Sequence, residues 1–170
     1  YLKNWFVLKH WRHVANELSG IEEYNIKKAK EFISKLDSRI FFSKVDDFFN
    51  IIVSSNGEDI YLEYLSSGFK SAFYILLGIL NEIEYMHGKD TMPADEYSGI
   101  VLIDELELHL HPIWQQKIIQ ILKAEFPKVQ FFITSHSPHI IQSAKYSEII
   151  VLEKKDALES NIPFEVVKRD

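Results

Sequence analysis

The sequence contains no cysteine, which excludes a disulfide framework and any thiolate metal site and fits a cytoplasmic protein. It has no apolar run as long as a membrane span and no visible signal peptide, so we expect no membrane contact. The chain has fewer basic than acidic residues, with 19 Lys and Arg against 25 Asp and Glu, which gives a formal net charge of -6. We therefore expect DNA to be contacted, if at all, through regions outside these residues.

The remaining composition is that of a globular protein. Hydrophobic residues make up 46% and charged residues 26% of 170 positions, enough for one domain with a sizeable core. The first part reads as helical. Apolar spacings of three and four predict a helix over residues 2–18 that buries Trp5, Leu8, Trp11, Val14 and Leu18, and a second helix that buries Ile26, Ala29, Phe32, Ile33 and Leu36. A short helix over 41–49 would complete a helical segment, 1–49.

From residue 50 onward the pattern changes. Asn56-Gly57 between two apolar runs predicts a hairpin of strands 50–54 and 59–64. We further predict a buried helix over 71–87, strands over 100–103, 129–134 and 149–152, helices over 112–126 and 138–144, and an edge strand over 164–167. Continuous apolar strands that alternate with helices indicate an α/β fold whose parallel sheet is covered on both faces.

Two carboxylates follow directly on one of these strands. The apolar run 100–103 leads into Asp104 and Glu105. A parallel strand delivers such groups to the carboxyl end of the sheet, where open α/β sheets bind ligands. In a nucleotide hydrolase the first carboxylate would hold Mg²⁺ and the second would deprotonate the attacking water. On this motif alone, a strand that ends in a solvated acidic turn is an equally good interpretation.

A histidine follows the next strand. The run 129–134 ends in Ser135, His136 and Ser137. A neighbouring parallel strand would bring His136 close to Glu105, where an imidazole can hydrogen-bond a γ-phosphate or the attacking water. The alternative is that Ser137 caps the following helix and His136 is a bystander. The spacing from the acidic pair favours the functional interpretation.

A third polar motif, Ser66-Ser67-Gly68-Phe69-Lys70, precedes the buried helix of 71–87. Hydroxyls, a glycine and free amides at a helix N-terminus form an anion site. In isolation, an ordinary helix cap by one of the serines explains the motif better.

The order and spacing of the three motifs resemble the ABC-type ATPase superfamily, and within it the RecF, SMC and OLD-like AAA ATPase branch. The likeness covers about residues 50–155. Residues 65–70 resemble the signature motif, 100–105 the Walker B motif, and His136 the switch histidine. The stretch 105–112 resembles the branch's EPELHLHP segment around the D-loop, with Leu106 in place of the common proline. The implied fold is a P-loop NTPase-like parallel sheet flanked by helices, with 50–170 forming the C-terminal part of the ATPase domain.

The resemblance also implies roles for single residues. Asp104 would hold Mg²⁺, Glu105 would be the general base and His136 the γ-phosphate sensor. The signature residues Ser66, Ser67, Gly68 and Lys70 would contact ATP held by a second ATPase head, which makes a homodimer the expected working form. Such a head would drive a DNA-repair or antiphage-defence effector, among which a nuclease is possible.

The fold implied by the resemblance is incomplete in this chain. No GxxxxGK[ST] loop is present, and the only Gly-Lys step, Gly88-Lys89, lacks the rest of that motif. Without the loop there is no backbone cradle for the phosphates and no lysine on the β- and γ-phosphates. We expect the 170 residues alone to be inactive, with the phosphate loop on an absent N-terminal lobe.

Two other functions remain as alternatives. One is a non-hydrolysing interaction module derived from an ATPase, which would have no need to keep Asp104, Glu105 and His136. The other is a metal-dependent hydrolase, because His109 and His111 flank Leu110 and such a pair can bind zinc. No third ligand lies at metal spacing, so the resemblance, which gives this pair a structural role, is preferred.

Overall fold

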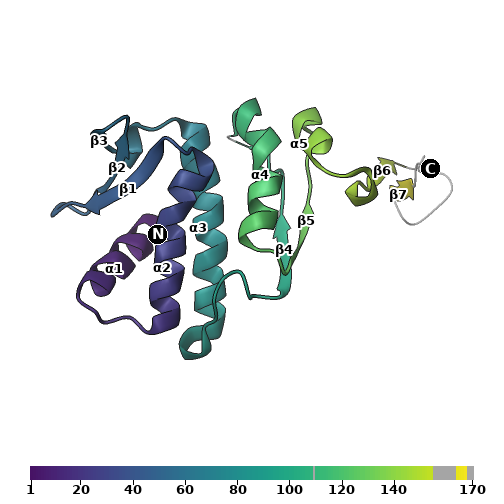
Figure 1. Ribbon diagram of the computed structural model, residues 1–170. Helices are drawn as coiled ribbons and strands as arrows, with labels where there is room; N and C mark the ends of the chain where they lie inside the picture. The colour runs from purple at the N-terminus through teal and green to yellow at the C-terminus, as the bar shows by residue number, and fades with distance from the viewer. Residues whose placement is uncertain (109, 155–163, 168–170) are drawn as a thin grey trace.

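The computed structural model describes residues 1–108, 110–154 and 164–167. In its N-terminal part three helices pack beside a small antiparallel sheet (Figure 1). The helices are α1 (Leu2–Val14), α2 (Gly20–Leu36) and α3 (Ser67–His87), and the strands are β1 (Ile40–Val45), β2 (Ile51–Ser55) and β3 (Glu58–Tyr61). A short 3-10 turn, η1 (Leu62–Tyr64), leads from β3 to α3. No helix in the parts of the chain given above is long and apolar enough to cross a membrane.

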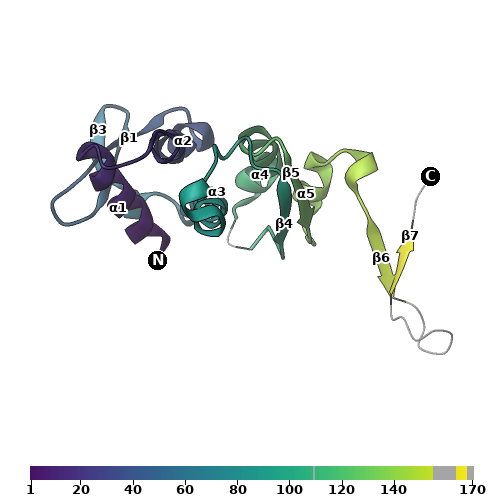
Figure 2. The same ribbon diagram turned by 90° about the horizontal axis from the view of Figure 1, so that it is seen from below.

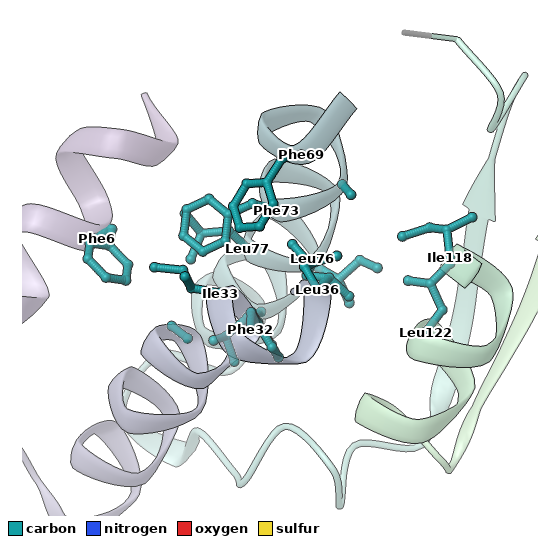
Figure 3. Packing of buried hydrophobic residues seen from close by; sticks show 14 of the residues in the cluster. Phe6, Phe32, Ile33, Leu36, Phe69, Phe73, Leu76, Leu77, Ile118 and Leu122 are labelled. Atoms are coloured by element: carbon teal, nitrogen blue, oxygen red, sulfur yellow. The ribbon is translucent and has the colours of Figure 1, made fainter. Parts of the chain in front are cut away.

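The two central helices form the core as their sequence patterns predict. Ser19 starts α2 with a capping box, in which its hydroxyl accepts from the Glu22 amide and the Glu22 carboxylate accepts from the Ser19 amide. The predicted face of α2 is buried, and Phe32 and Ile33 are fully enclosed. Figure 3 shows this face meeting α3 from one side, while Ile118 and Leu122 approach α3 from the other. A helix enclosed on both sides has to be apolar around most of its surface, as α3 is.

The predicted buried face of α1 is only partly confirmed. Trp5 packs against the core, and so does Leu18, although the helix ends at Val14 and not at residue 18. Leu8 and Val14 are 61% and 56% exposed, whereas Phe6, Val7 and His10 are buried. Phe6 packs edge-on against Phe42 and Phe73, with ring centroids 5.7 and 6.0 Å apart. The helix is therefore oriented so that Phe6, with its two aromatic contacts, faces the core in place of the stripe that includes Leu8.

The predicted short helix over 41–49 is wrong as well. Residues 40–45 are strand β1, which pairs antiparallel with β2 and ends with Val45 opposite Ile51. The chain then turns because the Asp46 carboxylate accepts hydrogen bonds from the amides of Phe48 and Asn50. Antiparallel pairing with the next strand, β2, outweighs the local helical spacing. The Asn56-Gly57 hairpin is confirmed, with both residues at positive φ, 53° and 85°.

The second part of the chain is the parallel α/β unit. Its elements are η2 (Gly88–Asp90), β4 (Gly99–Ile103), α4 (Pro112–Glu125), β5 (Val129–Ile133), α5 (Pro138–Ser143) and η3 (Tyr146–Glu148). Strands β4 and β5 pair in parallel from Gly99 opposite Val129 to Ile103 opposite Ile133, so their carboxyl ends are level. The α/β class and the parallel pairing of these strands are confirmed.

The parallel sheet is covered on only one face within the described residues, contrary to the prediction of two. Burial alternates along both strands. Val101 and Phe131 pack against the core, whereas Ile100, Leu102 and Phe132 are 62%, 76% and 47% exposed. Apolar side chains on the open face of a parallel sheet are unusual, because such sheets are normally buried on both sides.

The third predicted strand does not join this sheet. Strand β6 (Val151–Lys154) pairs antiparallel with β7 (Phe164–Val167), and the two form a separate ribbon. Figure 2 shows this ribbon at the end of the molecule opposite β1–β3, with the layers of α2, α3, α4 and the β4–β5 pair between them.

Candidate functional site

The level ends of β4 and β5 bring the acidic turn and the histidine motif to one edge of the sheet. The Thr134 amide donates to the Ile103 carbonyl at 3.0 Å. The Thr134 hydroxyl donates to Asp104 Oδ1 at 2.5 Å and accepts from the Glu105 amide at 2.8 Å. Sequence reasoning did not assign Thr134 to the site. Its place as the first residue after an apolar strand, level with Asp104, is the signal that could have found it.

Glu105 lies in a strained turn. Its φ is 46°, in the left-handed region that a glutamate adopts only at a cost of about 1 kcal/mol or more. The next residue, Leu106, is 2% exposed, and its amide donates to the Thr134 carbonyl at 3.2 Å. The leucine that replaces the common proline therefore anchors the turn in the core and supplies a hydrogen bond that proline lacks. The Asp104 and Glu105 side chains stay exposed at the edge.

His136 lies at the same edge, although its hydrogen bond runs to Glu107 and not to Glu105. The His136 amide donates to Glu107 Oε1 at 2.5 Å, and the His136 side chain is exposed. Ser137 caps α5, since its hydroxyl accepts from the His139 amide at 3.2 Å. The helix cap by Ser137 is therefore confirmed, and the functional role of the exposed His136 stays a prediction.

The Ser66–Lys70 motif lies at the start of α3. Ser66 is the N-cap and accepts from the Phe69 amide at 3.2 Å, so the cap alternative is correct. Helix α3 begins at Ser67, four residues earlier than predicted, and both serines are exposed at its N-terminus. Lys70 donates to the Glu63 carbonyl at 2.8 Å. Exposed hydroxyls at a helix N-terminus are typical of an anion site, and a ligand role for this motif stays a prediction.

Gly68 packs against the beginning of α4. A Cβ at this position would lie 2.7 Å from Trp114 Cδ1 and 3.2 Å from the His111 amide nitrogen. The adjacent ring of Phe69 meets Trp114 edge-on, with centroids 5.6 Å apart. The close approach of α3 and α4 therefore already requires a glycine at this position.

The donor set of the edge suits Mg²⁺ better than zinc. Asp104 offers an exposed carboxylate next to the Thr134 hydroxyl, and Mg²⁺ takes oxygen ligands with several waters and phosphate oxygens. In the part of the chain that the structure covers, no group of three His, Cys, Asp or Glu residues could hold a metal. His111 is the N-cap of α4, accepting from the Ile113 amide at 3.5 Å, and His109 lies outside the described residues.

A parallel strand pair that carries an acidic turn and a histidine at its carboxyl edge is typical of the nucleoside triphosphatase class of α/β folds. The profile of the AAA ATPase domain family matches residues 7–141, and the chain belongs to this family. Its sequence relatives include the Septu protein PtuA of Bacillus thuringiensis, 47% identical over 153 residues, which are 88% of this chain and 39% of that protein.

A second relative is the "Retron Vc95 probable ATPase" of Vibrio cholerae, 34% identical over 127 residues, or 75% of this chain and 24% of that protein. The chain thus spans well under half the length of the curated relatives it matches. Both relatives agree with the predicted RecF, SMC and OLD-like branch.

Solved structures agree on the fold. One similar chain comes from a study of ATP-driven dimerization and DNA-stimulated activation of SMC ATPases, with a TM-score of 0.59 and 16% identity over 87% of this chain and 84% of that one. Another is an SMC head bound to the C-winged helix domain of ScpA, with a TM-score of 0.52 and 18% identity over 85% of this chain and 42% of that one. The predicted P-loop NTPase-like fold is therefore confirmed.

Proposed function

We propose that this chain supplies the hydrolytic half of an ATPase head, with Asp104 as the Mg²⁺-binding carboxylate, Glu105 as the general base and His136 as the γ-phosphate sensor. The observation that carries the proposal is the hydrogen-bonded joint between the two strand ends, in which Thr134 bonds both Asp104 and the Glu105 amide. Separate strands thereby contribute an acid pair and an imidazole to one edge, where open α/β sheets bind ligands.

The residues divide the chemistry between them. Mg²⁺, when bound, neutralises charge on the phosphate oxygens. Asp104 would hold it through water, as one carboxylate among water and phosphate ligands. Glu105, exposed beside it, would orient the attacking water and accept its proton at the carboxylate. His136 would donate a hydrogen bond to the γ-phosphate as negative charge develops there.

The other ATP contacts would come from outside this chain. The phosphate-gripping loop has no counterpart in the sequence, and Ile100, Leu102 and Phe132 leave one sheet face open. We propose that a lobe of a longer protein covers this face and carries the loop. The length of the relatives supports such a protein, since the chain spans 39% and 24% of two of them.

A second head would complete the site. Ser66, Ser67, Gly68 and Lys70 would face ATP held by that head, at an α3 N-terminus whose amides favour an anion. The solved SMC ATPase chain of similar fold comes from work on ATP-driven dimerization, which supports the same arrangement here. The Septu and retron relatives favour an antiphage-defence effector over a DNA-repair one.

The test is Glu105→Gln in the full-length protein. We expect the ATPase rate to fall about 100-fold or more, because the base is lost while its shape stays. Dimers should accumulate with ATP in this slowed variant, measured by light scattering. An unchanged rate would remove the general base assignment, and a failure of ATP to promote dimers would remove the two-head model. A wild-type protein that binds ATP without turnover would favour the non-hydrolysing interaction module instead.

A further inference from the structure

Glu107 makes a hydrogen bond that the ATPase motifs do not explain. Its Oε1 atom accepts from the His136 amide at 2.5 Å. Burial raises the pKa of the half-buried Glu107 carboxyl, but hydrogen bonds from the Ser135 side chain and the His136 amide outweigh that effect, and the pKa is lowered from its ordinary value. The carboxylate therefore stays ionised at neutral pH, and a charge-assisted bond of this kind is about twice as strong as a neutral one.

Gln115 holds the same loop from the first turn of α4. Its Oε1 atom accepts from the Ser137 hydroxyl at 2.5 Å, and its Nε2 atom donates to the Leu110 carbonyl at 2.8 Å. Ser137 is 8% exposed, so its bond to Gln115 is shielded from water. The amide thus joins the acidic turn to the cap of α5.

These contacts hold the loop from both sides of His136. Glu107 accepts from the His136 amide, and Gln115 accepts from the Ser137 hydroxyl. The imidazole itself is exposed, and its charge also helps to lower the pKa of Glu107. We propose that Glu107 and Gln115 are positioning residues, which fix the backbone on either side of His136 so that its imidazole meets the γ-phosphate with little reorganisation. The inference rests on the proposed function of that histidine.

Stability alone does not account for the arrangement. Both neighbouring helices have caps of their own, His111 for α4 and Ser137 for α5. Each added hydrogen bond at a partly exposed site contributes only about 1 kcal/mol to folding. A loop fixed in place matters more for catalysis, because a displacement of about 1 Å at a catalytic group can lower the rate about 100-fold.

The first experiment uses Glu107→Leu and Gln115→Leu in the full-length protein. We expect kcat to fall about 10- to 100-fold with the KM for ATP changed less than about threefold, since the loss appears mainly in the transition state. Glu107→Gln keeps one acceptor and should stay within a few-fold of wild type. The matched control is Gln116→Leu, on the same helix and 3.4 Å from His139 Nδ1 but exposed, which should leave kcat unchanged. Equal losses in Gln115→Leu and Gln116→Leu would overturn the proposal.

A double variant tests whether Glu107 acts through the histidine. Combined with His136→Ala, Glu107→Leu should cost nothing further, because two residues that act as a unit are non-additive. If it lowers kcat by the same factor in both backgrounds, the positioning role is wrong.

Amide hydrogen exchange at His136 separates this inference from the proposed function, because it needs no turnover. The amide should be protected in wild type and in Glu107→Gln, and exchange at least tenfold faster in Glu107→Leu. Unchanged protection in Glu107→Leu would refute positioning even in an active enzyme. A protein without ATPase activity would refute the proposed function while the exchange result still reported on the loop.

Discussion

The hydroxyl of Thr134 donates to the Asp104 carboxylate at 2.5 Å and accepts from the Glu105 amide at 2.8 Å. A single side chain directly after β5 therefore sets the position of both acidic residues that follow β4. Because Asp104 and Glu105 are exposed, water can take the place of these hydrogen bonds at little cost in stability. Water would not hold the two acidic residues in the same position.

Replacing Thr134 by valine removes both bonds without changing the size of the side chain. We expect Thr134→Val to lower kcat about tenfold or more and to raise the Mg²⁺ concentration needed for half-maximal activity. The free energy of unfolding should change by only about 1 kcal/mol. Thr134→Ser keeps the hydroxyl and serves as the control. Wild-type Mg²⁺ dependence in Thr134→Val would show that the hydroxyl does not position Asp104.

Gly68 and Gly78 lie in the same helix and should respond to alanine in opposite ways. At Gly68 the new methyl group would lie 2.7 Å from Trp114 Cδ1, so Gly68→Ala should destabilise the protein by about 1–3 kcal/mol. At Gly78 the nearest atom is Leu2 Cδ1 at 3.6 Å, and the helix propensity of alanine should add up to about 1 kcal/mol. Thermal unfolding gives both signs, and a stabilised Gly68→Ala would contradict the tight packing of α3 on α4.

Glu22 should make the free energy of unfolding depend on pH in the acid range. Burial raises its pKa, but hydrogen bonds from Lys9 and Ser19 outweigh burial and lower the pKa from 4.5 to about 2. A lowered folded-state pKa gives a contribution that is full above about pH 4.5 and is lost as the pH falls toward 2. Glu22→Gln should reduce this dependence, as urea unfolding at each pH would measure. Parallel stability curves for wild type and Glu22→Gln over that range would count against the ion pair with Lys9.

Leu102 tests the open sheet face. If a further lobe covers that face in the full-length protein, Leu102→Ser should lower the free energy of unfolding by about 2–4 kcal/mol. The comparison is Leu8→Ser on α1, which is 61% exposed against 76% for Leu102 and should change stability by less than about 0.5 kcal/mol. Similar small effects at both positions would mean that the face meets water.

The sequence predicts where the candidate site residues lie better than it predicts the packing around them. Asp104, Glu105 and His136 can be placed on one edge because strand ends in a parallel pair are level, and the register Ile103 to Ile133 agrees. Thr134 was not predicted as a site residue, because a hydroxyl that orients other side chains carries no charge and forms no motif of its own. Glu107 was likewise not predicted as a single residue and appeared only within the stretch 105–112. Its partner is the backbone amide of His136, which the sequence cannot indicate.

Local periodicity failed where strand pairing or tertiary packing decides. Residues 41–49 carry helical spacing, but 41–45 belong to β1, because β2 offers an antiparallel partner. In α1 two apolar stripes lie side by side, and the choice between Leu8 and Phe6 depends on where Phe42 and Phe73 lie. The division of the chain at residues 49 and 50 remains a prediction, although β1 and β2 pair across it.

Under the proposed function, the left-handed backbone of Glu105, at φ 46°, sets the demands of folding against those of catalysis. Glycine or asparagine would occupy this turn at a lower conformational cost. A variant library selected only for heat resistance should therefore enrich those two residues at position 105 and discard the carboxylate. Selection for turnover should restore glutamate at some loss of thermal stability. Comparing the two selections would measure how much stability the φ angle of Glu105 costs for the sake of activity.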